Sequence, residues 1–261
     1  MLPLENTWMK LERAEEHLQA LESGVNAFLA SNPYTVSRDY DDQDELYRFR
    51  INICEKVPPR LGLLAGDAVH NMRAALDALT WQLALLTTSR PRHRTEFPVF
   101  AKATAKAKKD INSRLRDIPQ KAQDVIKSLQ PYHLGQKSET HVLWVLHCLD
   151  ITDKHKIIPL AQYALRLGTG AGETSLPRGA MGSTDLASGY IELGLKTVGD
   201  ADPNLEPNID LNVVFDVPRL LDPINALMLK QIYDYITNDL FFRFSEFFSQ
   251  PIQTKPSADI P

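Results

Sequence analysis

Hydrophobic residues recur every three or four positions over long stretches of the chain, which is the spacing of helices with one buried face. The first stretch, residues 5–31, ends before Pro33. The strongest, residues 61–86, contains no proline and is rich in Ala and Leu. The same pattern predicts further helices at 104–116, 120–130, 139–154 and 222–248. We expect the last helix to begin with Asp222 as its N-cap and Pro223 in its first turn.

Shorter segments alternate apolar and polar residues or are continuously apolar, which is typical of strands. They are residues 47–53, 157–167, 190–198 and 209–217. We therefore expect a small, mainly antiparallel sheet formed largely by the segment 157–217. Because these strands carry too few apolar residues to form a core alone, the pattern predicts an α+β fold in which a mainly helical bundle carries the sheet.

The chain shows no internal repeat and no linker that separates two cores, so residues 1–250 are predicted to form a single α+β domain. Residues 38–45 are polar and are expected to form a loop. Residues 168–188 are rich in Gly, Ser and Thr and predict a mobile linker. The polar, Pro-rich residues 251–261 predict a disordered tail.

The composition excludes several classes of protein. The 261 residues are 43% hydrophobic and 24% charged, with a formal net charge of -4. No apolar run approaches the ~20 residues needed to span a bilayer. Charges interrupt the N-terminal segment at every turn, unlike a secretory signal, so we expect a cytoplasmic protein. Cys54 and Cys148 lie in apolar periodic segments and are expected to be reduced core thiols.

A helical wheel of the strongest predicted helix reveals an unusual second face opposite its core face. His70, Arg73, Asp77 and Trp81 gather there, with Asn71 at the edge and alanines between them. A solvated face is normally rich in Glu, Lys and Gln, so we expect this one to be covered and to line an internal site. The alternative is a buried hydrogen-bond network in which Arg73 and Asp77, four residues apart, pair with each other.

A second polar cluster lies where the fifth predicted helix meets the next strand. Asp153 is placed to orient the imidazole of His155, and Lys156 to hold an anion, since functional side chains are often presented at the ends of elements. Cations in a last helical turn also stabilise the helix C-terminus, which gives this cluster a structural alternative. We predict that it meets the face that carries His70 and forms one polar site with it.

Several motifs resemble a widespread group of uncharacterised bacterial and phage-associated proteins. They are RAEEHL at 13–18, GDAVHNMRAALD at 66–77, FP at 97–98, QPY at 130–132 and DKHK at 153–156. The resemblance implies a bacterial protein in a phage-related or defence setting and supports the choice of site residues. It implies no reaction. The helical bundle with His and Arg also resembles the HEPN ribonuclease superfamily in outline, without its diagnostic arginine followed after four to six residues by histidine.

Three chemistries compete for these residues. A metal site would use Asp67 and His70 with His147 and Asp150, but only one carboxylate-x-x-His pair has the right order, and Arg73 on the same face opposes a cation. A Cys–His nucleophile would need an exposed thiol, which the apolar settings of both cysteines disfavour. The third is a metal-independent site that cleaves phosphodiesters. We therefore predict no metal.

The charge distribution favours an anionic partner. Residues 90–116 carry nine Lys and Arg against Glu96 and Asp110, a local charge of +7 that leaves -11 for the other residues. A basic segment of this kind can contact nucleic acid or another anionic ligand. The glycines of residues 168–188 are not followed by Gly-Lys-Ser/Thr, so neither a phosphate loop nor a cofactor is predicted.

The sequence therefore leads to two functional hypotheses, and it leaves the oligomeric state open. The first is a metal-independent hydrolase of a phosphate-containing substrate such as RNA. His70 or His155 would be its general acid or base, Arg73 or Lys156 would stabilise phosphate charge, and Asp77 would support them. The second is a non-catalytic binding or structural module whose polar face specifies packing or holds a small anionic ligand.

Overall fold

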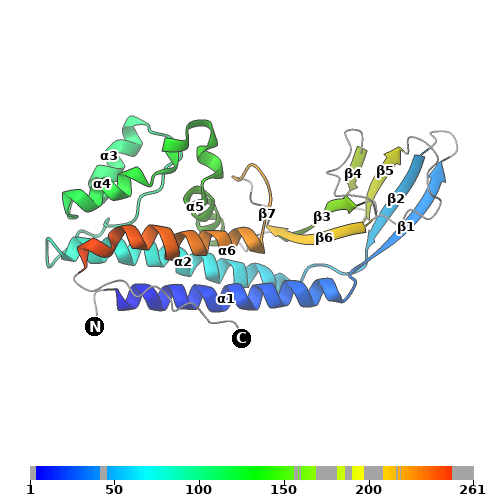
Figure 1. Ribbon diagram of the computed structural model, residues 1–261, viewed down its shortest axis with the longest axis horizontal. Coiled ribbons are helices and arrows are strands. Elements are labelled where there is room, and N and C mark those ends of the chain that lie inside the picture. The colour runs from blue at the N-terminus through cyan, green and yellow to red at the C-terminus, as the bar shows by residue number, and fades with distance from the viewer. Residues whose placement is uncertain are drawn as a thin grey trace. The chain divides into compact units, whose positions relative to one another are not determined.

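The computed structural model in Figure 1 describes residues 4–41, 46–155, 158, 160–168, 181–185, 190–196, 208–215, 217 and 219–248. The backbone contacts group into two compact units. Unit 1 consists of Met1–Glu22, Gly62–Pro159 and Phe215–Pro261, and unit 2 of Ser23–Leu61 and Leu160–Val214. Each unit is thus assembled from segments that are far apart in the sequence.

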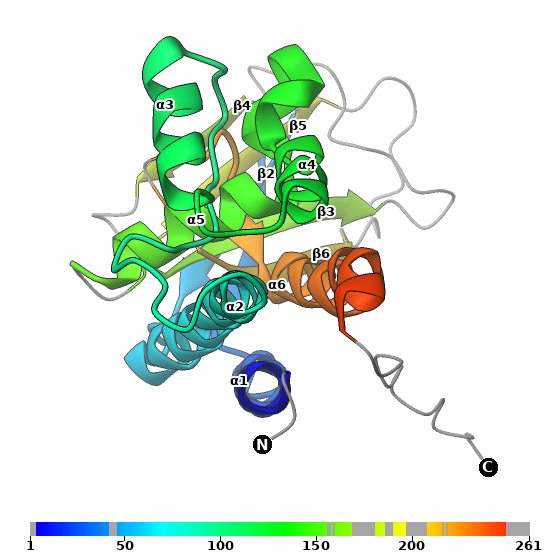
Figure 2. The ribbon, with the colours of Figure 1, turned by 90° about the vertical axis from the view of Figure 1, so that its left-hand side faces the viewer.

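Unit 1 is built of helices. It contains the start of α1 (Glu5–Ala30), most of α2 (Pro59–Leu85), α3 (Ala105–Arg114), α4 (Gln120–Ser128), the 3-10 segment η1 (Pro131–Thr140), α5 (Val142–Asp153) and α6 (Ala226–Asp234). A π-helical turn, η2 (Tyr235–Leu240), and a 3-10 turn, η3 (Phe241–Phe247), continue α6. Figures 1 and 2 both show α1, α2 and α6 side by side.

The predicted hydrophobic spacing becomes the core of unit 1. Leu11, Ala14, Leu18 and Leu21 of α1 are all buried. The core face of α2 is buried as well, from Ala68 to Leu83, and its many alanines allow neighbouring elements to approach closely. At the other end of the chain the ring of Phe241 lies 5.4 Å from that of Trp8 between ring centroids. The first and last helices therefore pack together.

Two sheets account for the strands. The first has the order β1-β2-β5-β4 and is antiparallel throughout, with β1 (Tyr34–Asp41), β2 (Leu46–Ile53), β5 (Tyr190–Lys196) and β4 (Met181–Asp185). The second has the order β3-β6-β7, with β3 (Leu160–Gly168), β6 (Asn208–Phe215) and β7 (Ile224–Asn225). Helices dominate the described residues, the pairings of the four-stranded sheet are antiparallel, and four of the strands lie in the segment 157–217. The prediction of a mainly helical α+β fold with a small, mainly antiparallel sheet is therefore confirmed.

Several finer expectations are corrected. Residues 34–41 form β1, although the second half of this strand, residues 38–41, was expected to belong to a polar loop. Met181–Asp185 form β4 inside the expected linker, and the rest of residues 169–188 lies outside the described residues. The last helix begins at Ala226, because Asn225 and not Asp222 accepts the capping hydrogen bond, from the backbone N–H of Met228 at 3.1 Å.

Some expectations stay predictions. The tail 251–261 lies outside the described residues. The single domain predicted for residues 1–250 also stays a prediction. Within the described ranges, no helix is both long enough and apolar enough to cross a membrane.

Candidate functional site

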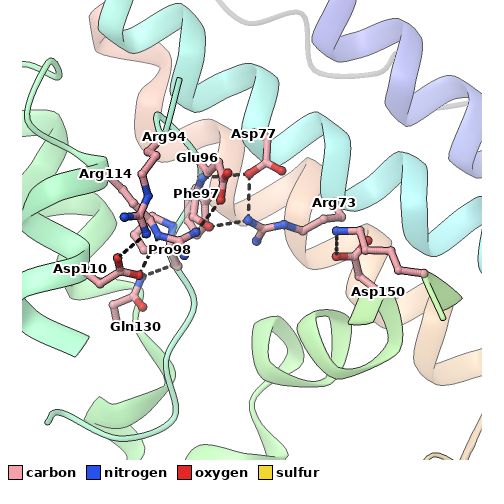
Figure 3. Close-up of polar contacts among 11 residues, drawn as sticks. Arg73, Asp77, Arg94, Glu96, Phe97, Pro98, Asp110, Arg114, Gln130 and Asp150 are labelled. Carbon is pink, nitrogen blue, oxygen red and sulfur yellow. Dashed lines mark hydrogen bonds and ion pairs between the residues drawn. The ribbon is translucent and has the colours of Figure 1, made fainter. Parts of the chain in front are cut away.

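Arg73 and Asp77 form a clamp on the main chain of Phe97. The Nη2 atom of Arg73 donates to Asp77 Oδ1 at 2.8 Å and to the carbonyl oxygen of Phe97 at 2.6 Å, as Figure 3 shows. The backbone N–H of Phe97 donates to the same Asp77 oxygen at 2.9 Å. Both main-chain polar groups of Phe97 are therefore satisfied by one ion pair on α2. We call this arrangement the clamp.

The clamp is largely withdrawn from water. The Arg73 side chain is only 9% exposed, and its Nη1 atom is buried without a hydrogen-bond partner among the described residues. Burial raises the pKa of Asp77, although the Arg73 charge and the Phe97 N–H both favour its ionised form. The expectation that this face is covered is confirmed at Arg73, which the segment around Phe97 covers, and is wrong at His70 and Trp81, which are exposed. The clamp matches the alternative interpretation of the sequence, in which Arg73 and Asp77 pair with each other inside a hydrogen-bond network.

Further bonds hold the segment after Phe97 in place. The buried Gln130 donates through Nε2 to the carbonyl oxygen of Pro98 at 2.7 Å and accepts from the N–H of Phe100 through Oε1 at 3.2 Å. Next to it, the guanidinium of Arg114 pairs with Glu96 at 2.6 Å and with Asp110 at 2.9 Å. Figure 3 shows these side chains and the clamp around the same stretch of backbone, at Glu96, Phe97 and Pro98; together we call them the network.

The end of α5 lies against the start of the predicted polar face on α2. A Cβ atom on Gly66 would come within 2.8 Å of Asp153 Cγ, so a larger residue would force this carboxylate to move. Burial raises the pKa of Asp153, and the nearby charges of Asp67 and Asp150 raise it further, whereas His70 lowers it. Asp153 and His70 are therefore close enough to interact electrostatically.

One turn earlier on α5, His147 and Asp150 lie near the clamp. Burial lowers the pKa of His147 to about 4, and the charge of Arg73 contributes to the shift. His147 is therefore neutral at pH 7. The buried carboxylate of Asp150 accepts from Lys154 Nζ at 2.7 Å. Side chains from the two predicted clusters thus interact along the α2–α5 contact in two places, one at Asp153 and one at Arg73.

The other candidate residues do not share one environment. Trp81 and His155 are exposed, and Asn71 donates to the backbone oxygen of Asp67 on its own helix at 2.8 Å. Lys156 lies outside the described residues. The predicted single polar site that includes all of these residues stays a prediction.

The described side chains also bear on the metal and thiol chemistries. Across the described segments no group of three or more His, Cys, Asp or Glu is arranged to hold a metal ion. Burial raises the pKa of the Cys148 thiol to about 11, as expected for a core thiol. Cys54, in contrast, is exposed, which corrects the expectation that it lies in the core. It follows Ile53 directly after β2, where the alternating pattern ends.

A groove of about 790 Å³ lies beside the network, on the part of unit 1 formed by residues 94–113 with α5 and the turn before it. Four cationic side chains and two aromatic rings line it: Arg94, Lys102, Lys106, Lys109, Phe100 and Trp144. Asp110 and Glu139 contribute carboxylates. The basic segment 90–116 therefore supplies one wall of a concave surface.

The groove could be anticipated from the sequence only in part. Its cations belong to the basic segment that the charge distribution identifies. Trp144 was missed, because α5 is apolar on nearly all sides and its periodicity does not show which ring faces a groove. The contribution of Phe100 depends on the clamp and on Gln130, which are contacts between segments far apart in the sequence.

The chain shows no significant match to a protein-family model, to a curated protein or to a solved structure. The resemblance to bacterial and phage-associated proteins and to HEPN ribonucleases therefore stays an expectation from the motifs alone.

Proposed function

We propose that unit 1 is a binding module that holds an anionic, phosphate-containing ligand in the groove. The observation that carries the proposal is the gathering of Arg94, Lys102, Lys106 and Lys109 around one concave surface. Cationic side chains that converge on a groove raise the local concentration of anions and are the usual ligands of phosphate oxygens.

The lysines of the groove are free to bind. Lys102, Lys106 and Lys109 are exposed and form no ion pair with any residue that the structure describes. Arg94 is already paired with Asp110 at 3.1 Å, so a ligand would compete with this carboxylate for the guanidinium. Surface pairs of this kind contribute little stability, about 0–1 kcal/mol, so the competition costs little.

The clamp gives Arg73 and Asp77 a structural role in the binding module rather than a catalytic one. The Nη2 atom of Arg73 and the Oδ1 atom of Asp77 are both engaged with the main chain of Phe97. Releasing them for a reaction would leave buried polar groups unpaired, at about 1–3 kcal/mol each. Their role is to fix the segment that continues into the groove wall.

Calorimetric titration of the full chain with inorganic tripolyphosphate tests the proposal. We expect binding that weakens as salt rises, because the ligand displaces counterions. Replacing Lys102, Lys106 and Lys109 together by Gln is expected to reduce affinity at least about tenfold, or about 1.4 kcal/mol. The matched control replaces Lys108, Lys121 and Lys137, which are exposed but lie outside the groove. Equal losses in both triple variants, or no binding by the wild type, would contradict the proposal.

A hydrolase is the second candidate, favoured by the electrostatic influence of His70 on Asp153. A carboxyl group whose pKa is raised by burial, next to a histidine, is a combination that general acid–base catalysis uses. The test is to incubate total RNA with the wild type and with His70→Ala and His155→Ala, with and without EDTA, and to record thermal melts in parallel. Cleavage lost in either variant at an unchanged melting temperature supports the hydrolase, and EDTA sensitivity would point to a metal. If the wild type does not cleave RNA, the hydrolase proposal is wrong.

A further inference from the structure

The groove combines cations with aromatic surface in a way that charge alone does not require. Trp144 and Phe100 line it together with the small side chains of Ala101 and Ala107. Simple phosphate sites are lined by donors and cations, whereas two rings offer an apolar, polarisable surface to a flat partner. A ligand that fills this groove therefore carries an aromatic or apolar part as well as negative charge.

The size of the groove leads to the same conclusion. Its volume of about 790 Å³ is typical of sites that enclose a whole small molecule, which run from about 300 to 1,000 Å³. A phosphate ion by itself would leave most of this space to water. The ligand is consequently a larger molecule, of which phosphate is one part.

Trp144 also has an unmet hydrogen-bonding capacity. Its Nε1 atom is buried and has no acceptor within the described part of the chain. A buried N–H without an acceptor costs about 1–3 kcal/mol. Because this atom is buried, an acceptor on a bound ligand reaches it only after the ring turns in its site, and the edge of a nucleobase carries several such acceptors.

The first turn of α3 adds to the anionic part of the site. Thr104, which caps α3 by accepting from the N–H of Ala107 at 3.1 Å, lines the groove, and so does Lys106 in the first turn. The first N–H groups of a helix have no partner within the helix and favour negative charge nearby. Together with Lys102 and Lys109, this end of α3 can hold a phosphate group.

We infer that the groove binds a nucleotide unit, with its base against Trp144 and Phe100 and its phosphate near Lys102, Lys106 and the start of α3. The inference rests on the proposed function and deepens it by naming the ligand. Stacking on aromatic rings combined with cations along a phosphate chain is the way in which proteins hold nucleotides without base-specific contacts. The unit can be a free nucleotide or one residue of a single strand.

Comparison of matched ligands on the wild-type chain tests the inference without any substitution. Ribose 5-phosphate carries the sugar and phosphate of AMP but no base, and tripolyphosphate carries charge alone. We expect AMP to bind about tenfold or more tightly than ribose 5-phosphate, since base–aromatic stacking is worth about that factor. An oligonucleotide of eight adenosines that binds still more tightly identifies a strand as the source, and equal binding identifies the free nucleotide.

Two variants locate the base. Trp144→Leu is expected to reduce the preference for AMP over ribose 5-phosphate to less than about threefold, while Trp144→Phe, which keeps an aromatic ring, retains most of it. Because the measurement is a ratio of two affinities in the same protein, a loss of folded molecules affects both ligands equally.

The outcomes separate the two proposals. If AMP and ribose 5-phosphate bind equally while tripolyphosphate binds, the groove is an anion site and the nucleotide inference is wrong. If none of these ligands binds, the proposed function fails as well. If AMP is preferred but Trp144→Leu leaves the preference unchanged, the base lies elsewhere and the inference is overturned.

Discussion

The carboxylate of Asp153 lies directly against the backbone of Gly66, so that a Cβ atom at this position would come within 2.8 Å of Asp153 Cγ. A residue larger than glycine at position 66 would therefore force the Asp153 side chain to move. The GD pair that begins the longest motif of the chain therefore has a packing reason for its glycine.

Gly66→Ala should therefore destabilise the protein even though alanine is the better helix former. We expect a net loss of up to about 2 kcal/mol in chemical denaturation, because overpacking costs about 1–3 kcal/mol and the gain in helix propensity offsets only ~1 kcal/mol of it. In an Asp153→Ala background the same substitution should become stabilising by about 0.5–1 kcal/mol. A loss of equal size in both backgrounds would show that Asp153 is not the obstacle.

Asp77→Asn tests the clamp. The amide keeps the shape of the side chain but leaves the buried Arg73 charge without its partner, so we expect a loss of about 1–3 kcal/mol by urea denaturation. Glu16→Gln is the control, because the Arg13–Glu16 pair has side chains 60% and 62% exposed and should contribute less than about 0.5 kcal/mol. Similar losses from the two substitutions would contradict the clamp.

His147 makes stability depend on pH. Its pKa is lowered to about 4 in the folded chain, from an ordinary value of 6.5, so the unfolded chain takes up a proton first as the pH falls. Stability from this residue is complete above pH 6.5 and is lost as the pH falls toward 4. Between pH 7.5 and 4 the wild type should lose about 2–3 kcal/mol more than His147→Gln. Parallel curves for the two proteins would refute this assignment.

Limited proteolysis tests the prediction of a single domain. Because unit 1 is made of three chain segments and unit 2 of two, no single cut separates them into two continuous halves. We expect one cooperative thermal transition and no stable fragment that corresponds to either unit. Release of two independently folded halves would mean that the chain has two domains.

Hydrophobic periodicity was enough to predict the helices and most strands, since it records directly which positions are buried. Leu11 and Leu18 are buried on α1 as their spacing requires. The boundaries of the helices were harder to predict. Asp222 and Pro223 form a common helix start, but Ile224 and Asn225 pair as β7 instead, and the helix begins after them.

The candidate site could be predicted only where its residues share an element. Arg73 and Asp77 lie one helical turn apart, so their pairing is visible in the sequence. The segment that the pair holds cannot be recognised in the sequence, because Phe97 lies 20 residues beyond Asp77 and reaches it through a loop. Trp144 and Phe100 belong to the groove for the same reason, since tertiary contacts alone bring them together.

The packing of the first helix against the last has a consequence for synthesis. The hydroxyl of Tyr233 donates to Glu15 Oε2 at 3.3 Å across 218 residues of chain, and the Trp8–Phe241 contact spans a similar distance. At about 5–20 residues per second, a ribosome needs roughly 10–40 s to add the residues between them. During that time the side chains of α1 that contact the last segment, such as Trp8, lack these partners, so the core of unit 1 is completed only after the final helix has emerged.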